Sequence, residues 1–425
     1  MKKSLLRAAF VACLPFCATG LAVVMTVPAV AAEKAELPKL SKSFSKFVDE
    51  AKAANSAKDW QTVIAKCKEA QAAPDLTNYE TYLINRFLSV AYFGLNDHAN
   101  ARIALAAVLK NPETPLADRK FLVGPAIGLS AEVNDNAGVI EFGKMAIQDN
   151  AATLDNLSTL AVAYYNMNDF PNTLSTTQSG IDAAAKEGKV PPYNLYQVTA
   201  FTYDKQKNTQ AETKEFLAMA RDYGKPDDWK AALDLSLALL PAGGKGSMSG
   251  IATLDIYRLR AITEAGWVAQ NYNEMAEAAS ELGSWGDAKW ALETGLAKGV
   301  LTRAKVGQFL NEVTANAKKD EAGLPTVEKL AGTGKASVSA AEGYYGYGRF
   351  ADAARAAQKA IGLGGPTLGE AKLLLGMCQV RQGDETSAAQ TLTDISGDPS
   401  IVRAADLWTA WVTRKKAPPA APATH

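Results

Sequence analysis

The apolar residues of this chain recur in short helical stripes that are separated by tight polar turns. Each stripe ends in a small residue followed by an aromatic residue, a turn of Gly, Asn or Asp, a large residue, and a small residue three positions later. The clearest copy covers residues 341–353, and further copies cover 161–173 and 89–101. A phrase that returns every 20–50 residues predicts an array of stacked repeats.

The large residue after each turn marks the repeats. Most of the intervals between successive markers are close to one another in length, as expected of a single repeating unit. The interval from Tyr272 to Phe350 is about twice as long, which predicts a degenerate copy between Trp285 and Leu330. The interval that ends at Tyr272 is also long, and it has room for an extra helix at 227–240 and a Gly-rich loop at 241–250. The markers are Trp60, His98, Asn136, Phe170, Thr209, Tyr272, Phe350 and Glu385.

Positions around the markers agree in size, which predicts two short helices packed across each turn. Residues nine before the marker are mostly small, and residues three after it are small or β-branched in most copies. One helix pair cannot bury its own apolar face, so several pairs must stack. No region alternates apolar and polar residues with period two, so we expect an all-α fold. Tyrosines stand six before the marker at Tyr92, Tyr164, Tyr203 and Tyr344.

At these residues the pattern resembles the tetratricopeptide repeat family, whose repeating unit is one pair of helices joined by a turn. The resemblance covers about 41–411 and is strongest at 341–365 and 161–180. It implies an α-α superhelix, a solenoid of about 8–9 antiparallel helix pairs. Several copies run longer than the family's repeat, and the Pro expected near the end of each pair is approximated only at Pro112 and Pro366.

The first 32 residues have the pattern of a secretory signal peptide. Basic residues at the start precede a mostly apolar segment, and Ala29-Val30-Ala31 supplies a small-x-small cleavage pattern. Pro15 and Pro28 interrupt the segment and disfavour the alternative of an uncleaved anchor helix. No later stretch has the ~18 apolar residues of a membrane span. The leader has a bacterial appearance, and we expect a periplasmic protein.

The predicted organisation follows from these boundaries. The signal peptide covers 1–32 and an N-terminal linker covers 33–40. An N-terminal array at 41–222 and a C-terminal array at 253–413 flank the extra helix and the Gly-rich loop, which together cover 223–252. The Pro/Ala tail at 414–425 has nothing to pack, so we expect it to be disordered.

Charge and cysteine content restrict the possible partners. The chain has 45 basic and 45 acidic residues, and removal of the leader leaves a net charge of about −3. Nucleic-acid binding needs a basic footprint, so this balance argues against it and also against anionic membranes. Cys67 and Cys378 each lie in an apolar helical stripe, which favours buried small hydrophobic residues over a disulfide. A bridge between them would require the two ends of the array to touch.

The sequence contains no convincing catalytic, cofactor or metal motif. His98 takes a marker position and His425 lies in the tail. The Gly-rich segments 243–247 and 332–336 lack the Ser or Thr that a phosphate loop needs after its Lys, so we expect linkers. Asp227 and Asp228 fit the start of a helix. The repeats leave no room for a separate catalytic domain, and we therefore expect no enzyme, cofactor or metal.

The surface remains as the candidate functional feature. In the repeat family, residues five before the marker tend to face the concave groove, and residues twelve before it fall on the same wall. Aromatic residues and Arg are the most enriched in binding hot spots. Packing between repeats is the alternative role for the same positions, and it is favoured at Trp267. The predicted groove residues are Arg86, Phe93, Tyr165, Arg260, Trp267 and Tyr345.

We therefore expect an exported, non-catalytic scaffold that binds a protein or peptide partner in the cell envelope. The alternative is a binding protein for a non-protein ligand such as a cell-wall fragment. The absence of Asp, Asn and Gln clustered beside the aromatic residues disfavours sugars. A third alternative is an enzyme without a recognisable motif.

Overall fold

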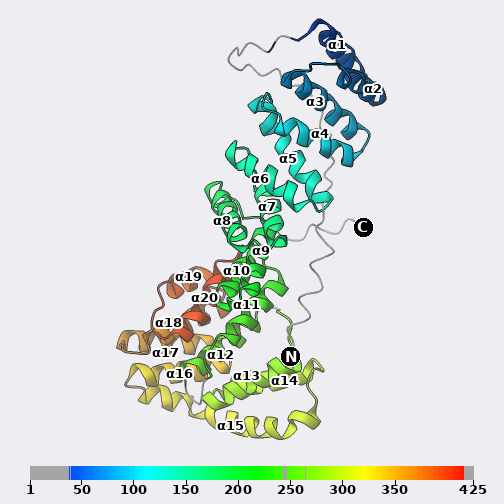
Figure 1. The fold of residues 1–425 in the computed structure, drawn as a ribbon. Coiled ribbons are helices and arrows are strands. Elements are labelled where there is room, and N and C mark those ends of the chain that lie inside the picture. The colour runs from blue at the N-terminus through cyan, green and yellow to red at the C-terminus, as the bar shows by residue number, and fades with distance from the viewer. Residues whose placement is uncertain (1–37, 39, 243–246, 264, 416–425) are drawn as a thin grey trace. The chain divides into compact units, whose positions relative to one another are not determined.

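The computed structural model describes residues 38, 40–242, 247–263 and 265–415. Within these ranges all regular secondary structure is helical, which confirms the predicted all-α class (Figure 1). The predicted leader, most of the linker, the tip of the Gly-rich loop and the tail from residue 416 lie outside the described residues. The helices are α1 (Lys42–Ser56), α2 (Trp60–Gln71), α3 (Asn78–Gly94), α4 (His98–Lys110), α5 (Leu116–Glu132), α6 (Asn136–Gln148), α7 (Leu154–Asn166), α8 (Phe170–Lys186), α9 (Tyr193–Lys205), α10 (Thr209–Tyr223), α11 (Pro226–Ala238), α12 (Met248–Arg260), α13 (Ala269–Leu282), α14 (Trp285–Ala297), α15 (Arg303–Leu330), α16 (Gly334–Gly346), α17 (Phe350–Leu363), α18 (Leu368–Arg381), α19 (Glu385–Leu392) and α20 (Pro399–Val412).

The helices fall into two compact units. Among the described residues, unit 1 runs up to Asn134 and also includes Met145–Ala151, and unit 2 consists of Asp135–Lys144 and the described residues from Ala152 onward. The segment 223–252, which the sequence sets apart from both arrays, lies in unit 2. Trp229 and Leu233 of α11 and Ala252 of α12 are buried in one hydrophobic core of that unit. The extra helix predicted at 227–240 is α11.

Seven of the turns between paired helices share one backbone geometry. The residue two before the second helix has a positive φ, and the next residue has ψ between 60° and 76°. The backbone N–H of that second residue donates to the carbonyl oxygen five positions earlier, as Asp169 does to Tyr164 at 2.9 Å. An αL residue at a helix end satisfies carbonyl groups that would otherwise lack partners. The residues with positive φ are Lys58, Asn96, Asn168, Lys207, Gly283, Gly348 and Gly383.

The sequence markers lie at the start of the second helix in most repeats. Trp60, His98, Phe170, Thr209, Phe350 and Glu385 each begin a helix directly after this turn. The small residues predicted at the helix contacts are buried, including Ala161, Ala341 and Ala353. The structure thus confirms the repeat of antiparallel helix pairs that the pattern predicts.

One marker is wrong. Tyr272 lies inside α13, whereas the tight turn of this repeat is Gly283-Ser284 and the second helix begins at Trp285. Ala276 and Ala288, at the small-residue positions counted from Trp285, are both fully buried. The segment predicted to hold a degenerate copy, Trp285 to Leu330, forms α14, which is the second helix of this repeat, and the 28-residue α15.

The last helix of unit 2 packs back onto an earlier one. The Trp408 indole of α20 donates to the backbone carbonyl of Asp255 in α12, at 3.0 Å between Nε1 and O and 153 residues apart in sequence. Trp408 is fully buried, and its neighbours in the same core include Cys378. Cys67 is buried in a separate core of unit 1. Both cysteines are free and buried, as expected of small hydrophobic side chains.

Candidate partner-binding surface

Phe93 and Tyr165 pack against the first residue of the following helix. The Phe93 ring lies 6.3 Å from the His98 ring, and the Tyr165 ring lies 6.2 Å from that of Phe170. Both side chains are half-buried, so each retains a solvent-facing edge. The groove role of these two residues stays a prediction.

Tyr345 corrects the prediction at the corresponding position of its repeat. Its ring packs at 5.1 Å from that of Phe350, but its side chain is only 4% exposed. The Arg258 guanidinium also covers this ring, with Cζ 4.5 Å from the Tyr345 ring centroid. Tyr345 therefore belongs to the core of unit 2 and is not available to a partner.

Arg86 connects two helices of unit 1. Its Nε donates to Asp118 of α5 at 3.0 Å, and the Tyr82 hydroxyl donates to the same carboxylate oxygen at 2.6 Å. The Arg86 side chain is mostly buried. Its guanidinium thus holds α5 against α3, and a role toward a partner stays a prediction.

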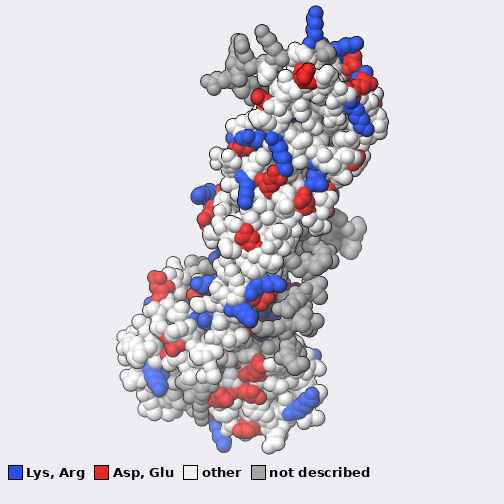
Figure 2. All heavy atoms as spheres, viewed as in Figure 1, with Lys and Arg blue, Asp and Glu red and all other residues white. Residues whose placement is uncertain are grey.

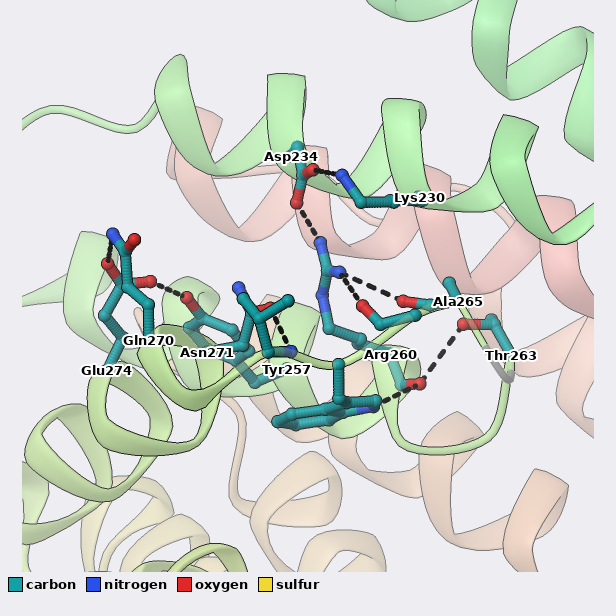
Figure 3. A network of polar contacts seen from close by, with 12 residues as sticks. Lys230, Asp234, Tyr257, Arg260, Thr263, Ala265, Gln270, Asn271 and Glu274 are labelled. Carbon is teal, nitrogen blue, oxygen red and sulfur yellow. Dashed lines mark hydrogen bonds and ion pairs between the residues drawn. The ribbon is translucent and has the colours of Figure 1, made fainter. Parts of the chain in front are cut away.

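Arg260 also corrects the prediction, because it is fully buried. At the end of α12 it donates to Asp234 of α11 and to the carbonyl oxygens of Ala265 and Gly266, at 3.1 and 3.2 Å (Figure 3). Figure 3 shows the guanidinium enclosed between α11 and the loop after α12. The physical cause is the shifted register, since Arg260 was placed on the groove by counting back from Tyr272.

Trp267 was placed by the same count, and it lies in the loop before α13. Its indole donates to the Arg260 carbonyl oxygen at 3.3 Å and stacks on Tyr272 with ring centroids 4.4 Å apart. The edge of Trp267 also meets Trp290 of α14 at 5.9 Å. Of the six residues predicted to line the groove, Arg260 and Trp267 are in contact with each other through this loop. Trp267 is half-buried, whereas its neighbour Trp290 is exposed.

Trp290 is the aromatic residue that the sequence search missed. Its side chain is 39% exposed, and it lines a groove of about 800 Å³ between α14 and α15. Residues at helical spacing on one face of α14 form one wall of the groove, and residues on one face of α15 form the opposite wall. Counting from Trp285 rather than Tyr272 would have placed Trp290 on the second helix of its repeat. The groove is lined by Gly286, Lys289, Trp290, Glu293, Asn311, Thr314, Ala315, Ala317, Lys318, Glu321, Ala322 and Tyr347.

Small and apolar side chains form much of this groove, and charges of both signs flank it. The Lys289 Nζ lies 3.9 Å from a Glu293 carboxylate oxygen on the same helix. The Tyr347 hydroxyl donates to the Ala317 carbonyl and to Asp320, at 3.0 and 2.8 Å, which fixes the end of the groove. Burial raises the pKa of Asp320, although the bond from Tyr347 opposes this. Figure 2 shows acidic side chains gathered over the region of α13 to α15 on the face drawn.

A buried ionic cluster lies next to this groove. Arg258 of α12 contacts three carboxylates: Asp255 at 2.8 Å, Asp287 of α14 at 2.7 Å and Glu342 of α16 at 2.6 Å. Burial raises the pKa of Asp255 well above its usual range, and the Glu342 charge adds to the shift. Burial opposes the charge of Arg258, but the three carboxylates outweigh it and raise the pKa of Arg258. The sequence shows no local sign of this cluster.

Two kinds of reactive group, a metal-binding cluster and a thiol, can be assessed among the described residues. They contain no group of three or more His, Cys, Asp or Glu side chains placed to hold a metal ion. Burial raises the pKa of the Cys67 and Cys378 thiols to about 12, so neither is a ready nucleophile. In the segment 332–336, Thr333 caps α16 by accepting from the Ala336 N–H at 3.2 Å. The other Gly-rich segment falls largely outside the described residues.

A helix can span a membrane only if it is long and apolar enough. None of the described helices has the length and apolar character needed to cross a bilayer.

The chain has a tetratricopeptide-like repeat fold. The tight turns and buried small residues of its own helix pairs carry this assignment. No family model matches the sequence, and no curated protein matches it.

Several solved helical-repeat structures are similar at low scores. One is the structure of Naa15/Naa10 bound to HypK-THB, with 16% identity and a TM-score of 0.30, covering 82% of this chain. The chain spans 57% of that structure's chain. Another is a tetratricopeptide repeat protein from Parabacteroides merdae, with 12% identity and a TM-score of 0.22, covering 77% of this chain and 99% of that one. The P58(IPK) TPR domain has 12% identity and a TM-score of 0.22, covering 87% and 98%.

Proposed function

We propose that this protein is an exported, non-catalytic scaffold that binds a segment of a protein partner in the groove between α14 and α15. The observation that carries the proposal is Trp290, a large aromatic side chain that is 39% exposed and lines a groove with a volume of about 800 Å³. Aromatic residues in such pockets are the most common binding hot spots.

The shape and chemistry of the groove favour a peptide or helix over a small molecule. Its lining on α15 runs from Asn311 to Ala322, a rise of about 17 Å at ~1.5 Å per residue. The small side chains Ala315 and Ala322 leave room for larger apolar side chains of a partner. Lys289 and Glu321 can pair with charges that flank those side chains. This pattern suits an amphipathic segment laid along the two helices.

Export to the periplasm is part of the proposal and rests on the leader sequence at 1–32. Mass spectrometry of the protein from its native cell should find an N-terminus at residue 32 or 33, as cleavage after Ala31 or Ala32 requires. Recovery of the uncleaved chain would overturn export.

Site-specific cross-linking tests the groove. A photoreactive amino acid at Asn311, which lines the groove, should trap a defined partner in intact cells. The same probe at Gln178, an exposed position on α8, is the matched control. Equal cross-linking from both positions, or no product from Asn311, would contradict a binding role for this groove.

A further inference from the structure

Four large apolar side chains are exposed at one end of the α15–α18 region of unit 2. Leu330 is 75% exposed at the last residue of α15, and Val327 one turn earlier is 45% exposed. Leu363 ends α17 and Leu368 begins α18, and both are also exposed. We call these four residues the leucine patch.

Contacts between the helices bring the members of the patch together. Lys359 of α17 donates from Nζ to the Glu328 carbonyl oxygen of α15 at 3.4 Å, and Arg355 reaches the Glu328 carboxylate at 2.9 Å. A Cβ on Gly334 would lie 2.7 Å from the Gly364 carbonyl oxygen and 3.2 Å from the Thr367 hydroxyl. The loop after Leu330 therefore touches the loop that joins Leu363 to Leu368.

The surroundings of the patch are basic. The segments 326–335 and 359–372 contain four lysines and two acidic residues. Of the acidic residues, Glu328 is engaged by Arg355 and Glu370 is buried. Lys329, Lys335 and Lys359 are exposed. Asp352 also approaches Glu328, but it is paired with Arg355, and Asp398 lies on the side of Glu370, so the exposed lysines dominate the charge around Leu330 and Leu363.

We propose that the leucine patch docks unit 2 on an anionic lipid surface. Apolar side chains that project from loop ends and are ringed by lysines can insert at the boundary between headgroups and acyl chains. Each nearby lysine adds attraction to anionic headgroups. Leu330 projects from a helix end, so its shape suits a deformable surface that can close around it. The charge balance of the whole chain argues against general binding to anionic membranes, but screening confines the interaction to charges within about 10 Å, so the lysines around the patch decide docking at this place.

Vesicle flotation tests the proposal with the mature chain. The protein should float with vesicles of phosphatidylcholine and phosphatidylglycerol, and much less with vesicles of phosphatidylcholine alone. High salt should weaken the binding, because the lysine contribution is screened. Failure to float with the anionic vesicles, or equal binding to both kinds, would overturn the proposal.

Variants separate the patch from the rest of the surface. The double variant Leu330→Ser/Leu363→Ser should reduce binding to anionic vesicles by about tenfold or more, since two inserted leucines are lost. The control Leu116→Ser/Phe121→Ser removes two exposed apolar side chains of α5 in unit 1 and should bind like the unmodified chain. Both variants should keep the original melting temperature, because all four positions are exposed. Unchanged flotation of the patch variant would overturn the proposal. A dimer that light scattering detects in the unmodified chain and that is lost in the patch variant would also overturn it.

Discussion

Arg258 and Asp287 form a buried ion pair that joins α12 to α14, with 2.7 Å between Nη2 and Oδ2. The same guanidinium also contacts Asp255 and Glu342, so three helices of unit 2 meet at one side chain. The Asp287 neighbour Gly286 lines the groove, and a Cβ there would lie 2.4 Å from the Gly346 carbonyl oxygen. The ionic cluster and this close backbone contact therefore set the position of one groove wall.

Removal of Arg258 should destabilise unit 2 strongly. Arg258→Met leaves three carboxylates around an apolar side chain, and breaking a buried ion pair in this way typically costs ~3–5 kcal/mol. Urea denaturation measures the loss. Arg355→Met is the control, since Arg355 pairs with Glu328 and Asp352 at the surface, and such pairs contribute about 1 kcal/mol or less. Equal effects of the two variants would contradict the role given to the cluster.

The stability of unit 2 should fall as the pH rises. Burial raises the pKa of Asp255 well above its usual value, and raises the pKa of Glu215 and Glu370 to about 7. Because these values lie above those of the unfolded chain, protonation favours the folded state, and this stability is lost as the pH rises through the folded pKa. Urea denaturation should give a larger unfolding free energy at about pH 5 than at about pH 8.

Glu370→Gln gives the matched test of this pH dependence. The variant cannot release the proton, so its stability should fall less steeply between about pH 5 and pH 8. An unfolding free energy that stays flat or increases over this range in the unmodified chain would contradict the assignment.

Overpacking at a helix contact should reveal the repeat register. Ala353 is fully buried three residues after the marker Phe350, so Ala353→Trp should cost ~1–3 kcal/mol. Ala351 on the same helix is exposed, and Ala351→Trp should leave the melting temperature nearly unchanged. If both variants melted alike, the register of this repeat would be wrong.

The repeats could be predicted because their turns are specified by local chemistry. A backbone position with positive φ favours Gly and Asn, and the cap position that follows it favours Asp and Asn. Most of the turns between paired helices carry these residue types in the sequence. Asp97 and Asp169, for example, accept from the N–H of Asn100 and Asn172. Such signals fix the start of the second helix to a single residue.

The region 253–284 could not be placed in the same way. The described residues 261–263 and 265–268 form a loop in which Gly266, with a positive φ, does not stand directly before the cap of a second helix. Tyr272 was predicted as the marker although it lies inside α13. Because the positions were counted from Tyr272, Arg260 and Trp267 were predicted to line the groove from a wrong register. The ionic cluster was also out of reach, because Arg258, Asp287 and Glu342 meet only when three distant helices pack.

Tyr345 shows why groove residues are difficult to infer from one helix. Tyr345 was predicted to line the groove, yet both it and its neighbour Tyr344 are buried. A helix inside a stacked array contacts neighbours on more than one side, so adjacent positions can both lie in the core. Exposure therefore depends on where in the array a helix lies.

The environment of the Tyr345 hydroxyl leads to a prediction about stability. This buried oxygen has no hydrogen-bond partner among the described residues. A buried polar group without a partner is destabilising, so Tyr345→Phe should be as stable as the unmodified chain or more stable. Tyr345→Ala should instead lose ~3–5 kcal/mol through the cavity it leaves. Thermal melts compare the two, and a marked loss for Tyr345→Phe would mean that the hydroxyl has a partner.

The most direct test of the proposed function is the affinity of the cross-linked partner for the Trp290→Ala variant. We predict a loss of ~2 kcal/mol or more, about 30-fold in Kd, because Trp290 is the exposed aromatic side chain of the groove. Val300→Ala, which shortens an equally exposed apolar residue outside the groove lining, should bind normally. An unchanged Kd for Trp290→Ala, measured by calorimetry on a fully folded variant, would contradict partner binding in the α14–α15 groove.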